Sequence, residues 1–166
     1  GVAASDEKLF NNHKVIITPL KSTNQEAVSA IETMWQSAGA SVVMMDPAHH
    51  DQVLAQTSHL PHLLAYALID TLSAQGDSLE IFEYAAGGLR DFSRIAASDP
   101  TMWRDIFRSN SDAVLSILNQ YQHELSTLRA LIEDGDFDQL SAVFARSKKA
   151  RDHFSEVLAR RETNKT

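Results

Sequence analysis

The sequence predicts a mainly α-helical fold that is preceded by a small parallel βαβ unit. Two short runs rich in β-branched and apolar residues lie at 14–18 and 41–45, with a helical pattern between them. From residue 46 onward, apolar residues recur at spacings of three and four, which is the period of an amphipathic helix. We therefore place a domain boundary between residues 45 and 46, with one region over 1–45 and an all-helical region over 46–166.

The first region contains one strand–helix–strand unit. The run Lys14–Thr18, which Pro19 ends, predicts a buried strand. A helix is expected over 24–38, with Gly39 as its terminator, and Ser41–Met45 is expected as the second strand. Two strands joined by a helix pair in parallel with a right-handed crossover. A sheet of two strands is not stable on its own.

The helical region begins with a recognisable start signal. Asp46-Pro47 places an N-cap residue before a proline in the first turn. Pro61 is expected to kink or restart this helical run. A break is expected at Gly76-Asp77, and a short helix near Leu79–Tyr84 is expected to lead to a tight turn at Gly87-Gly88.

A second Asp-Pro pair, Asp99-Pro100, repeats the start signal of Asp46-Pro47. A short helix that carries Arg94 precedes it, so two helices are expected to meet at a corner. Trp103 lies on the first turn after this corner. A cation and an aromatic side chain can therefore converge on one small volume, which suits a compact organic anion.

The longest helical pattern runs from residue 100 to about residue 134, or roughly 50 Å at 1.5 Å per residue. Its apolar residues recur close to a heptad spacing: Val114, Leu118, Tyr121, Leu125, Leu128 and Ile132. Such a seam requires a partner. Gly135 ends the pattern, and Asp136 with Gln139 resembles the capping box of a last helix that extends to about Arg160.

Composition excludes several classes of function. A chain of 166 residues with 43% hydrophobic content can form one domain, or one domain and a piece of another. A net charge of −7 argues against binding to nucleic acid, which usually requires a basic face. No apolar run has the length of a membrane span, and no cysteine is present for disulfides. We expect a cytoplasmic protein that binds neither nucleic acid nor membranes.

Two blocks of sequence resemble the prephenate dehydrogenase family. One is Ser58-His59-Leu60-Pro61-His62, and the other is the stretch from Gly87 to Ile106 that contains Arg94 and Trp103. They occur in the family's order and at its spacing. The resemblance covers nearly all of the chain but begins in the middle of a family member. It implies that 1–45 is the end of a Rossmann-like nucleotide-binding domain and that 46–166 is a helical dimerisation domain.

The resemblance also implies an activity, the NAD- or NADP-dependent oxidative decarboxylation of prephenate to 4-hydroxyphenylpyruvate in tyrosine biosynthesis. The implied enzyme is a homodimer that associates through the long helix at 100–134. The family places its Gly-rich cofactor fingerprint and its catalytic histidine before the residue that corresponds to Gly1, and no GxGxxG pattern occurs here. We therefore expect this fragment to contain no catalytic residue, to bind no cofactor and to be inactive alone.

Three residues match the substrate-binding positions of the family most directly. Arg94 is expected to clamp a substrate carboxylate, and its alternative role is a surface salt bridge with Asp91 or Asp99. His62 is expected to donate to a substrate carboxylate or to orient the ring, and His59, one turn earlier, is a further candidate. The alternative for both histidines is a structural role beside a kinked helix.

Three more residues are candidates for the same site. Ser58 is expected either to contact the ligand or to cap a helix. Trp103 is expected to line the pocket, or otherwise to belong to the core. Asp91 is expected to reach the neighbouring subunit's site, as the family's intertwined dimer implies, or to pair locally with Arg90 or Arg94.

A metal site is not expected. His49, His50 and Asp51 lie near His59 and His62 in sequence, but their spacing does not give a closed set of ligands. His49 and His50 also point to different sides of a helix.

Two other functions stay open. An arogenate dehydrogenase differs only in a substrate amine where prephenate has a keto group. A non-catalytic helical module that dimerises and binds an aromatic acid such as tyrosine is the more distant alternative. That module predicts that Arg94 and His62 face apart or that side chains fill their pocket, whereas the enzyme predicts an open cavity between them.

Overall fold

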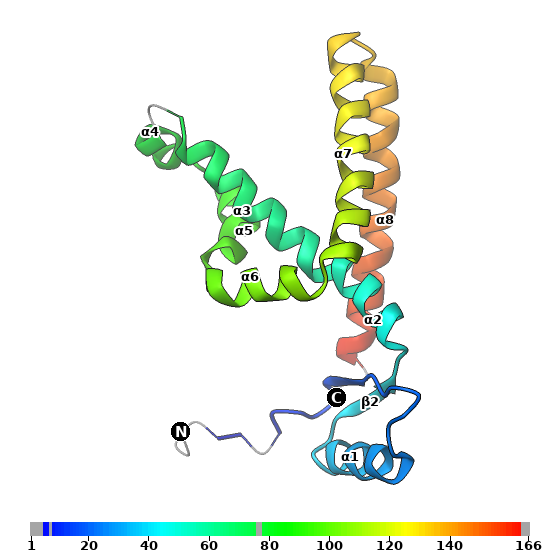
Figure 1. Ribbon diagram of the computed structural model, residues 1–166. Helices are drawn as coiled ribbons and strands as arrows, with labels where there is room; N and C mark the ends of the chain where they lie inside the picture. The colour runs from blue at the N-terminus through cyan, green and yellow to red at the C-terminus, as the bar shows by residue number, and fades with distance from the viewer. Residues whose placement is uncertain (1–4, 7, 76–77, 164–166) are drawn as a thin grey trace. The chain divides into compact units, whose positions relative to one another are not determined.

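The computed structural model describes residues 5–6, 8–75 and 78–163. These residues form two compact units. One unit spans Ala48–Gln122, and the residues before and after it make up the other. The chain is mainly helical with one small parallel sheet, as the sequence predicts (Figure 1).

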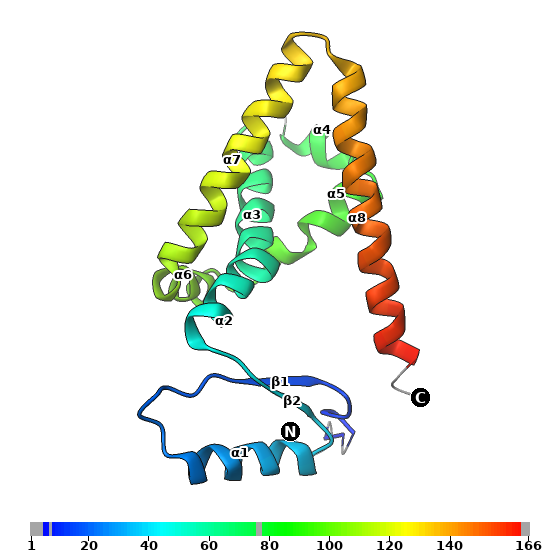
Figure 2. The ribbon, with the colours of Figure 1, turned by 90° about the vertical axis from the view of Figure 1, so that its right-hand side faces the viewer.

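The N-terminal region is the predicted βαβ unit. It consists of β1 (Lys14–Ile17), α1 (Gln25–Ser37) and β2 (Ser41–Met44). The two strands pair in parallel, with Lys14 opposite Ser41 and Ile17 opposite Met44. Helix α1 runs beside this pair of strands (Figure 2).

Both ends of α1 follow from local sequence. The Asn24 side chain accepts hydrogen bonds from the backbone N–H groups of Glu26 (2.7 Å) and Ala27 (3.2 Å), which makes Asn24 the N-cap. At the other end, Gly39 has a φ of +86°, a value that an L side chain rarely adopts. The predicted terminator is therefore confirmed.

The expectation that β1 is a buried strand is wrong within the described residues. Its side chains alternate between exposed and half-buried, and Ile16 is 36% exposed. Strands of a parallel sheet become buried only when both faces are covered. An open apolar hollow of about 440 Å³ lies along β1 and α1 instead, lined in part by Val15, Ile17, Val28 and Ile31.

The second unit starts with one long helical run that contains a widened turn. It comprises α2 (Pro47–Leu54), the π-helical segment η2 (Ala55–His59) and α3 (Leu60–Ser73). Pro61 has no N–H to donate to the preceding turn, so the helix cannot keep its regular pattern there. The run accommodates this with the π turn just before Pro61, which confirms the expected distortion.

Three short helical segments follow: α4 (Ser78–Glu83), α5 (Gly87–Ser93) and the 3₁₀ segment η3 (Arg94–Ala97). The predicted short helix is confirmed as α4, while Gly76-Asp77 lies outside the described residues. The predicted tight turn at Gly87-Gly88 is wrong, because both glycines lie in the first turn of α5. Ala86 is extended and makes the change of direction instead.

The predicted single helix over 100–134 is also wrong. Two helices occupy it, α6 (Pro100–Ser109) and α7 (Ser111–Glu133), and Asn110 interrupts them with a φ of −125° and a ψ of 35°. The Asn110 side chain forms tertiary hydrogen bonds that fix this break. The start of α6 is as predicted, since the Asp99 carboxylate accepts from the N–H of Met102 at 2.8 Å.

The last helix, α8 (Phe137–Thr163), forms a helical hairpin with α7 (Figure 2). Gly135 has a φ of +70° in the connecting loop, and Asp136 caps α8 by accepting from the N–H of Gln139 at 3.0 Å. Large apolar side chains of this hairpin are exposed: Leu125, Ile132, Phe137, Phe144, Phe154 and Leu158. None of the helices in the described part of the chain is long and apolar enough to span a membrane.

Candidate functional site

The unit Ala48–Gln122 brings two of the predicted site residues into direct contact. His62, near the start of α3, stacks on Trp103 of α6 with ring centroids 3.7 Å apart and an interplanar angle of 24°. Trp103 is buried, with 5% of its surface exposed, and His62 is half-buried. The indole therefore forms a flat wall behind the imidazole.

The backbone of η2 sets the tautomer of His62. Its Nδ1 lies 2.9 Å from the carbonyl oxygen of Ser58, and a carbonyl can only accept. Nδ1 therefore carries the hydrogen, and Nε2 of the neutral ring carries a lone pair. Neutral His62 can accept from a hydroxyl or ammonium group, whereas protonated His62 can donate to a carboxylate.

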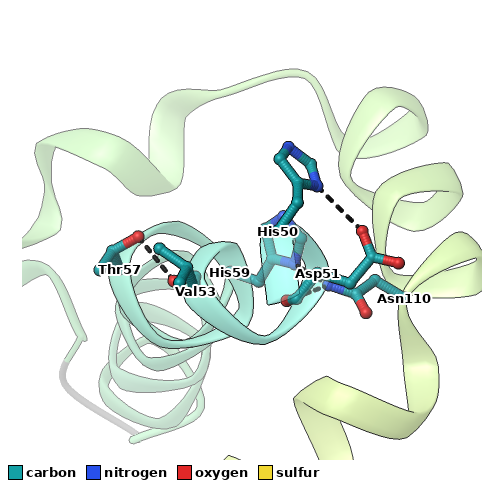
Figure 3. A network of polar contacts seen from close by, with 6 residues as sticks. All are labelled: His50, Asp51, Val53, Thr57, His59 and Asn110. Atoms are coloured by element: carbon teal, nitrogen blue, oxygen red, sulfur yellow. Dashed lines mark hydrogen bonds and ion pairs between the residues drawn. The ribbon is translucent and has the colours of Figure 1, made fainter. Parts of the chain in front are cut away.

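His59 is the most buried of the candidate polar residues, with 8% of its surface exposed. Its ring packs edge-to-face against Trp103 (6.1 Å between centroids) and Phe107 (6.4 Å). The Asn110 side-chain nitrogen lies 3.2 Å from His59 Nδ1 (Figure 3). The histidine motif therefore contains one buried ring, His59, and one half-buried ring, His62.

Burial is the main cause that lowers the pKa of His59 below its ordinary value. The nearby charge of Asp51 acts in the opposite direction, and His50 and His62 add smaller lowering effects. The lowered pKa favours the neutral form of the His59 ring. This form is suited to packing and to hydrogen bonding as an acceptor at Nδ1.

The corner before α6 is fixed from α3. The Tyr66 hydroxyl donates to the carbonyl oxygen of Ser98 at 2.6 Å, and the Ser98 hydroxyl donates to the carbonyl of Ile95 at 2.7 Å. Ser98 is extended, and Asp99 caps the helix that begins next. These contacts fix the start of α6 and therefore the position of Trp103 in its first turn. Its indole Nε1 is buried and has no hydrogen-bond partner among the described residues.

Arg94 is the first residue of η3 and is exposed. Its alternative role, a salt bridge with Asp91 or Asp99, is not found among the described residues. Asp91 lies instead 3.3 Å from Nε of Arg90, in a pair whose side chains are both mostly exposed. Asp99 is engaged as the cap of α6. The roles predicted for Arg94 at a substrate and for Asp91 at a neighbouring subunit stay predictions.

Ser58 lies inside η2, so its alternative role as a helix cap is wrong. The helical run continues through this residue, and its carbonyl serves as the acceptor for His62. The hydroxyl of Ser58 as a ligand contact stays a prediction.

We next looked for a metal-binding cluster and for a Gly-rich dinucleotide-binding turn among the described residues. Within the described ranges, no group of three or more His, Asp or Glu side chains could hold a metal ion. The loop between β1 and α1 contains no glycine, so it lacks the Gly-rich turn that cradles a pyrophosphate.

Sequence reasoning missed Asn110, Phe107 and Tyr66. Phe107 packs on Trp103 with centroids 5.7 Å apart, and Tyr66 anchors the corner. A signal for Asn110 was present in the polar run 109–112, because asparagine and serine compete with helical hydrogen bonding through their side chains.

Family models match both regions of the chain. Residues 46–146 match the prephenate dehydrogenase dimerization domain, and residues 1–44 match the prephenate dehydrogenase nucleotide-binding domain. Cyclohexadienyl dehydrogenase of Zymomonas mobilis is 40% identical over 153 residues, which is 91% of this chain and 52% of that protein. Prephenate dehydrogenase of Bacillus subtilis is 37% identical, over 92% of this chain and 41% of that protein. The chain thus spans about half the length of the curated relatives it matches.

Solved structures give the same result. Prephenate dehydrogenase from A. aeolicus, in complex with hydroxyphenyl propionate and NAD+, has a TM-score of 0.84 at 37% identity and covers 93% of this chain and 54% of its own. Synechocystis arogenate dehydrogenase has a TM-score of 0.80 at 27% identity, over 93% of this chain and 56% of its own. The chain therefore belongs to the prephenate dehydrogenase family.

Proposed function

We propose that the full-length protein containing this chain is an NAD- or NADP-dependent prephenate dehydrogenase. In this proposal residues 1–45 complete the nucleotide-binding domain, and residues 46–166 form the dimerisation and substrate-binding domain. The two family models and the relatives' names support the assignment. The observation that carries it is the stack of His62 on the buried face of Trp103.

The residues of this chain bind and orient the substrate. Prephenate has two carboxylates and a ring alcohol. Protonated His62 can donate from Nε2 to a carboxylate while Nδ1 stays bonded to Ser58, and Trp103 limits the position of the imidazole from behind. Arg94, which is exposed and forms no salt bridge with the other described residues, is proposed as the clamp for the other carboxylate.

Arogenate is a second candidate substrate, and the tautomer of His62 is the observation that favours it. With Nδ1 donating to a carbonyl, neutral His62 presents a lone pair, which can accept from an ammonium group. Arogenate carries such an amine where prephenate has a keto group. The likeness to Synechocystis arogenate dehydrogenase supports the same candidate.

We also propose a homodimer. The sequence predicts that it forms through one long helix at 100–134, a range that α6 and α7 occupy, and we add α8 to the proposed interface. The matched domain is described as a dimerization domain. Within this chain the apolar side chains of the hairpin lack cover: Leu125 is 47% exposed and Phe144 is 58% exposed. Several large exposed apolar side chains on one pair of helices support an interface with another chain.

The test is formation of reduced nicotinamide by the full-length protein, offered prephenate or arogenate with NAD or NADP. Loss of one partner of a desolvated charge pair costs about 2 to 5 kcal/mol, so Arg94→Ala should lower kcat/KM roughly a hundredfold or more. Arg104→Ala is the matched control, because Arg104 is an exposed arginine that pairs with its neighbour Asp105.

Each outcome separates the candidates. Turnover of prephenate that collapses only in Arg94→Ala supports the enzyme, the substrate and the clamp together. A strong preference for arogenate changes the substrate alone. A folded protein that binds the cofactor but turns over neither substrate would contradict the proposal and favour a regulatory module of the same fold.

A further inference from the structure

Asn110 is the residue at which the predicted long helix breaks. It ends α6, and its backbone N–H still donates to the carbonyl of Ile106 at 3.1 Å. The next residue starts α7. The side chain of Asn110 is half-buried at this junction between two helices, and it reaches the helical run α2–η2.

One nitrogen of Asn110 serves two acceptors on that run. Its Nδ2 lies 2.8 Å from the carbonyl oxygen of Asp51 and 3.2 Å from Nδ1 of His59 (Figure 3). A backbone carbonyl accepts only, so the atom facing Asp51 is the amide nitrogen, with two hydrogens to give. Its second hydrogen points to His59, whose Nδ1 must then carry a lone pair and whose Nε2 must carry the hydrogen.

The orientation of the His59 ring affects the two aromatic rings that it contacts, Trp103 and Phe107. Its ring edge meets Trp103 at an interplanar angle of 78° and Phe107 at 76°. Trp103 in turn carries His62 on its face. A rotation of the His59 ring would remove the edge contact that Trp103 has on that side.

We propose that Asn110 is a positioning residue for the substrate site: its carboxamide holds His59 in one tautomer and one orientation, and His59 seats Trp103 against His62. This inference rests on the proposed function in one respect, which is that His62 and Trp103 face the substrate. The contacts themselves are independent of the substrate.

The groups around His59 determine how it responds to a change at Asn110. Asp51 and His50, which pair with each other at 3.0 Å, lie on α2, and His62 lies on α3. Asp105 of α6 lines the same open hollow of about 610 Å³ as His59. A carboxylate in place of the amide of Asn110 would require Nδ1 of His59 to carry a hydrogen, which reverses the tautomer and favours the charged ring.

The first experiment compares rates in the full-length protein. Asn110→Ala should lower kcat/KM about tenfold, whereas Asn119→Ala, at an exposed asparagine of α7, should stay within about twofold of the wild type. Asn110→Asp keeps the shape of the side chain and serves where the alanine variant folds poorly. It should lower kcat/KM and move the acid limb of its pH profile upward.

The second experiment does not depend on activity. Histidine ring signals are followed by NMR in wild type, Asn110→Ala and Asn110→Asp, and His59→Asn identifies the His59 signal. His62 should show an upfield ring-current shift from Trp103 that decreases in both Asn110 variants. The titration midpoint of His59 should rise in Asn110→Asp.

The outcomes of the two experiments are distinguishable. If the wild type turns over substrate and Asn110→Ala matches Asn119→Ala, the inference is overturned while the proposed function holds. If the wild type has no activity, the proposed function fails, and the NMR result decides the inference. Unchanged His59 and His62 signals in both Asn110 variants overturn it in either case.

Discussion

The unit Ala48–Gln122 and the part of the α7–α8 hairpin that follows it, from His123 onward, are stabilised by different interactions. In the unit, side-chain hydrogen bonds join residues far apart in sequence, such as Tyr66 to Ser98 and Asn110 to Asp51. In the hairpin, ion pairs link residues three or four positions apart on one helix, as in Arg129–Glu133 and Lys148–Asp152.

The apolar side chains show the same contrast. Trp103 and Ala65 are buried within the unit, whereas Phe144 and Phe137 of the hairpin are more than half exposed. Local ion pairs support a helix but do not position it against another element. The unit is therefore stabilised by its own packing, and the hairpin surface is completed by a partner in the proposed dimer.

The largest effect should come from breaking the unit at its centre. Trp103→Ala removes a buried indole that contacts His59, His62 and Phe107, and it should lower the free energy of unfolding by about 3 to 5 kcal/mol. Phe137→Ala, at an exposed ring of the hairpin, should cost within about 0.5 kcal/mol when unfolding is measured on the dissociated protomer, where no partner covers this ring. Urea unfolding of the two variants measures both. If both substitutions lower the free energy of unfolding by the same amount, the two regions do not differ in how far their own packing stabilises them.

The next effect tests the hairpin as an interface. Phe144→Asp places a charge on the exposed apolar surface, and burying it unpaired should cost several kcal/mol, so dimer affinity should fall by a factor of at least about a hundred. Ala142→Asp adds the same charge on the opposite face of α8 and should leave affinity nearly unchanged. Sedimentation equilibrium gives both constants. A dimer that tolerates Phe144→Asp would place the interface elsewhere.

Sequence alone predicted the elements that local chemistry determines. Gly39 and Asp99 act where a terminator and a cap were expected, because each acts on the backbone of its own turn. The break at Asn110 could not be predicted in this way. Its partners Asp51 and His59 lie more than fifty positions earlier, so the helical period of the surrounding residues masks it.

The candidate site shows the same limit. The Ser-His-Leu-Pro-His motif identified His62, and the structure places it on Trp103. The motif could not tell the half-buried His62 from the buried His59, since burial depends on α6 packing against η2. The turn expected at Gly87-Gly88 failed for a different reason. Glycine has no Cβ and adopts helical or turn geometry, so a Gly-Gly pair does not by itself decide between them.

A smaller effect is the pH dependence that His59 contributes to the unit. Because burial lowers the pKa of folded His59, the unfolded chain takes up a proton first as pH falls below about 6.5. Stability from this group is complete above that pH and declines toward the lowered pKa, by at most about 1.4 kcal/mol per pH unit. His59→Asn keeps an acceptor for Asn110 and should remove this slope. Urea unfolding of both proteins at pH 5 and pH 7 measures this difference. If the free energy of unfolding changes by the same amount between the two pH values in the wild type and in His59→Asn, the assignment is wrong.

The smallest effect should come from the ion pairs of the hairpin. Lys148 and Asp152 lie 2.6 Å apart, but their side chains are 77% and 59% exposed, so solvent screens the attraction. Lys148→Ala should therefore change the free energy of unfolding by only about 0.3 to 0.5 kcal/mol, and the difference should shrink further in 1 M salt. Lys149→Ala, at an adjacent exposed lysine, controls for the loss of charge. If Lys148→Ala lowers the free energy of unfolding nearly as much as Trp103→Ala does, the hairpin is stabilised by its own ion pairs and does not depend on a partner.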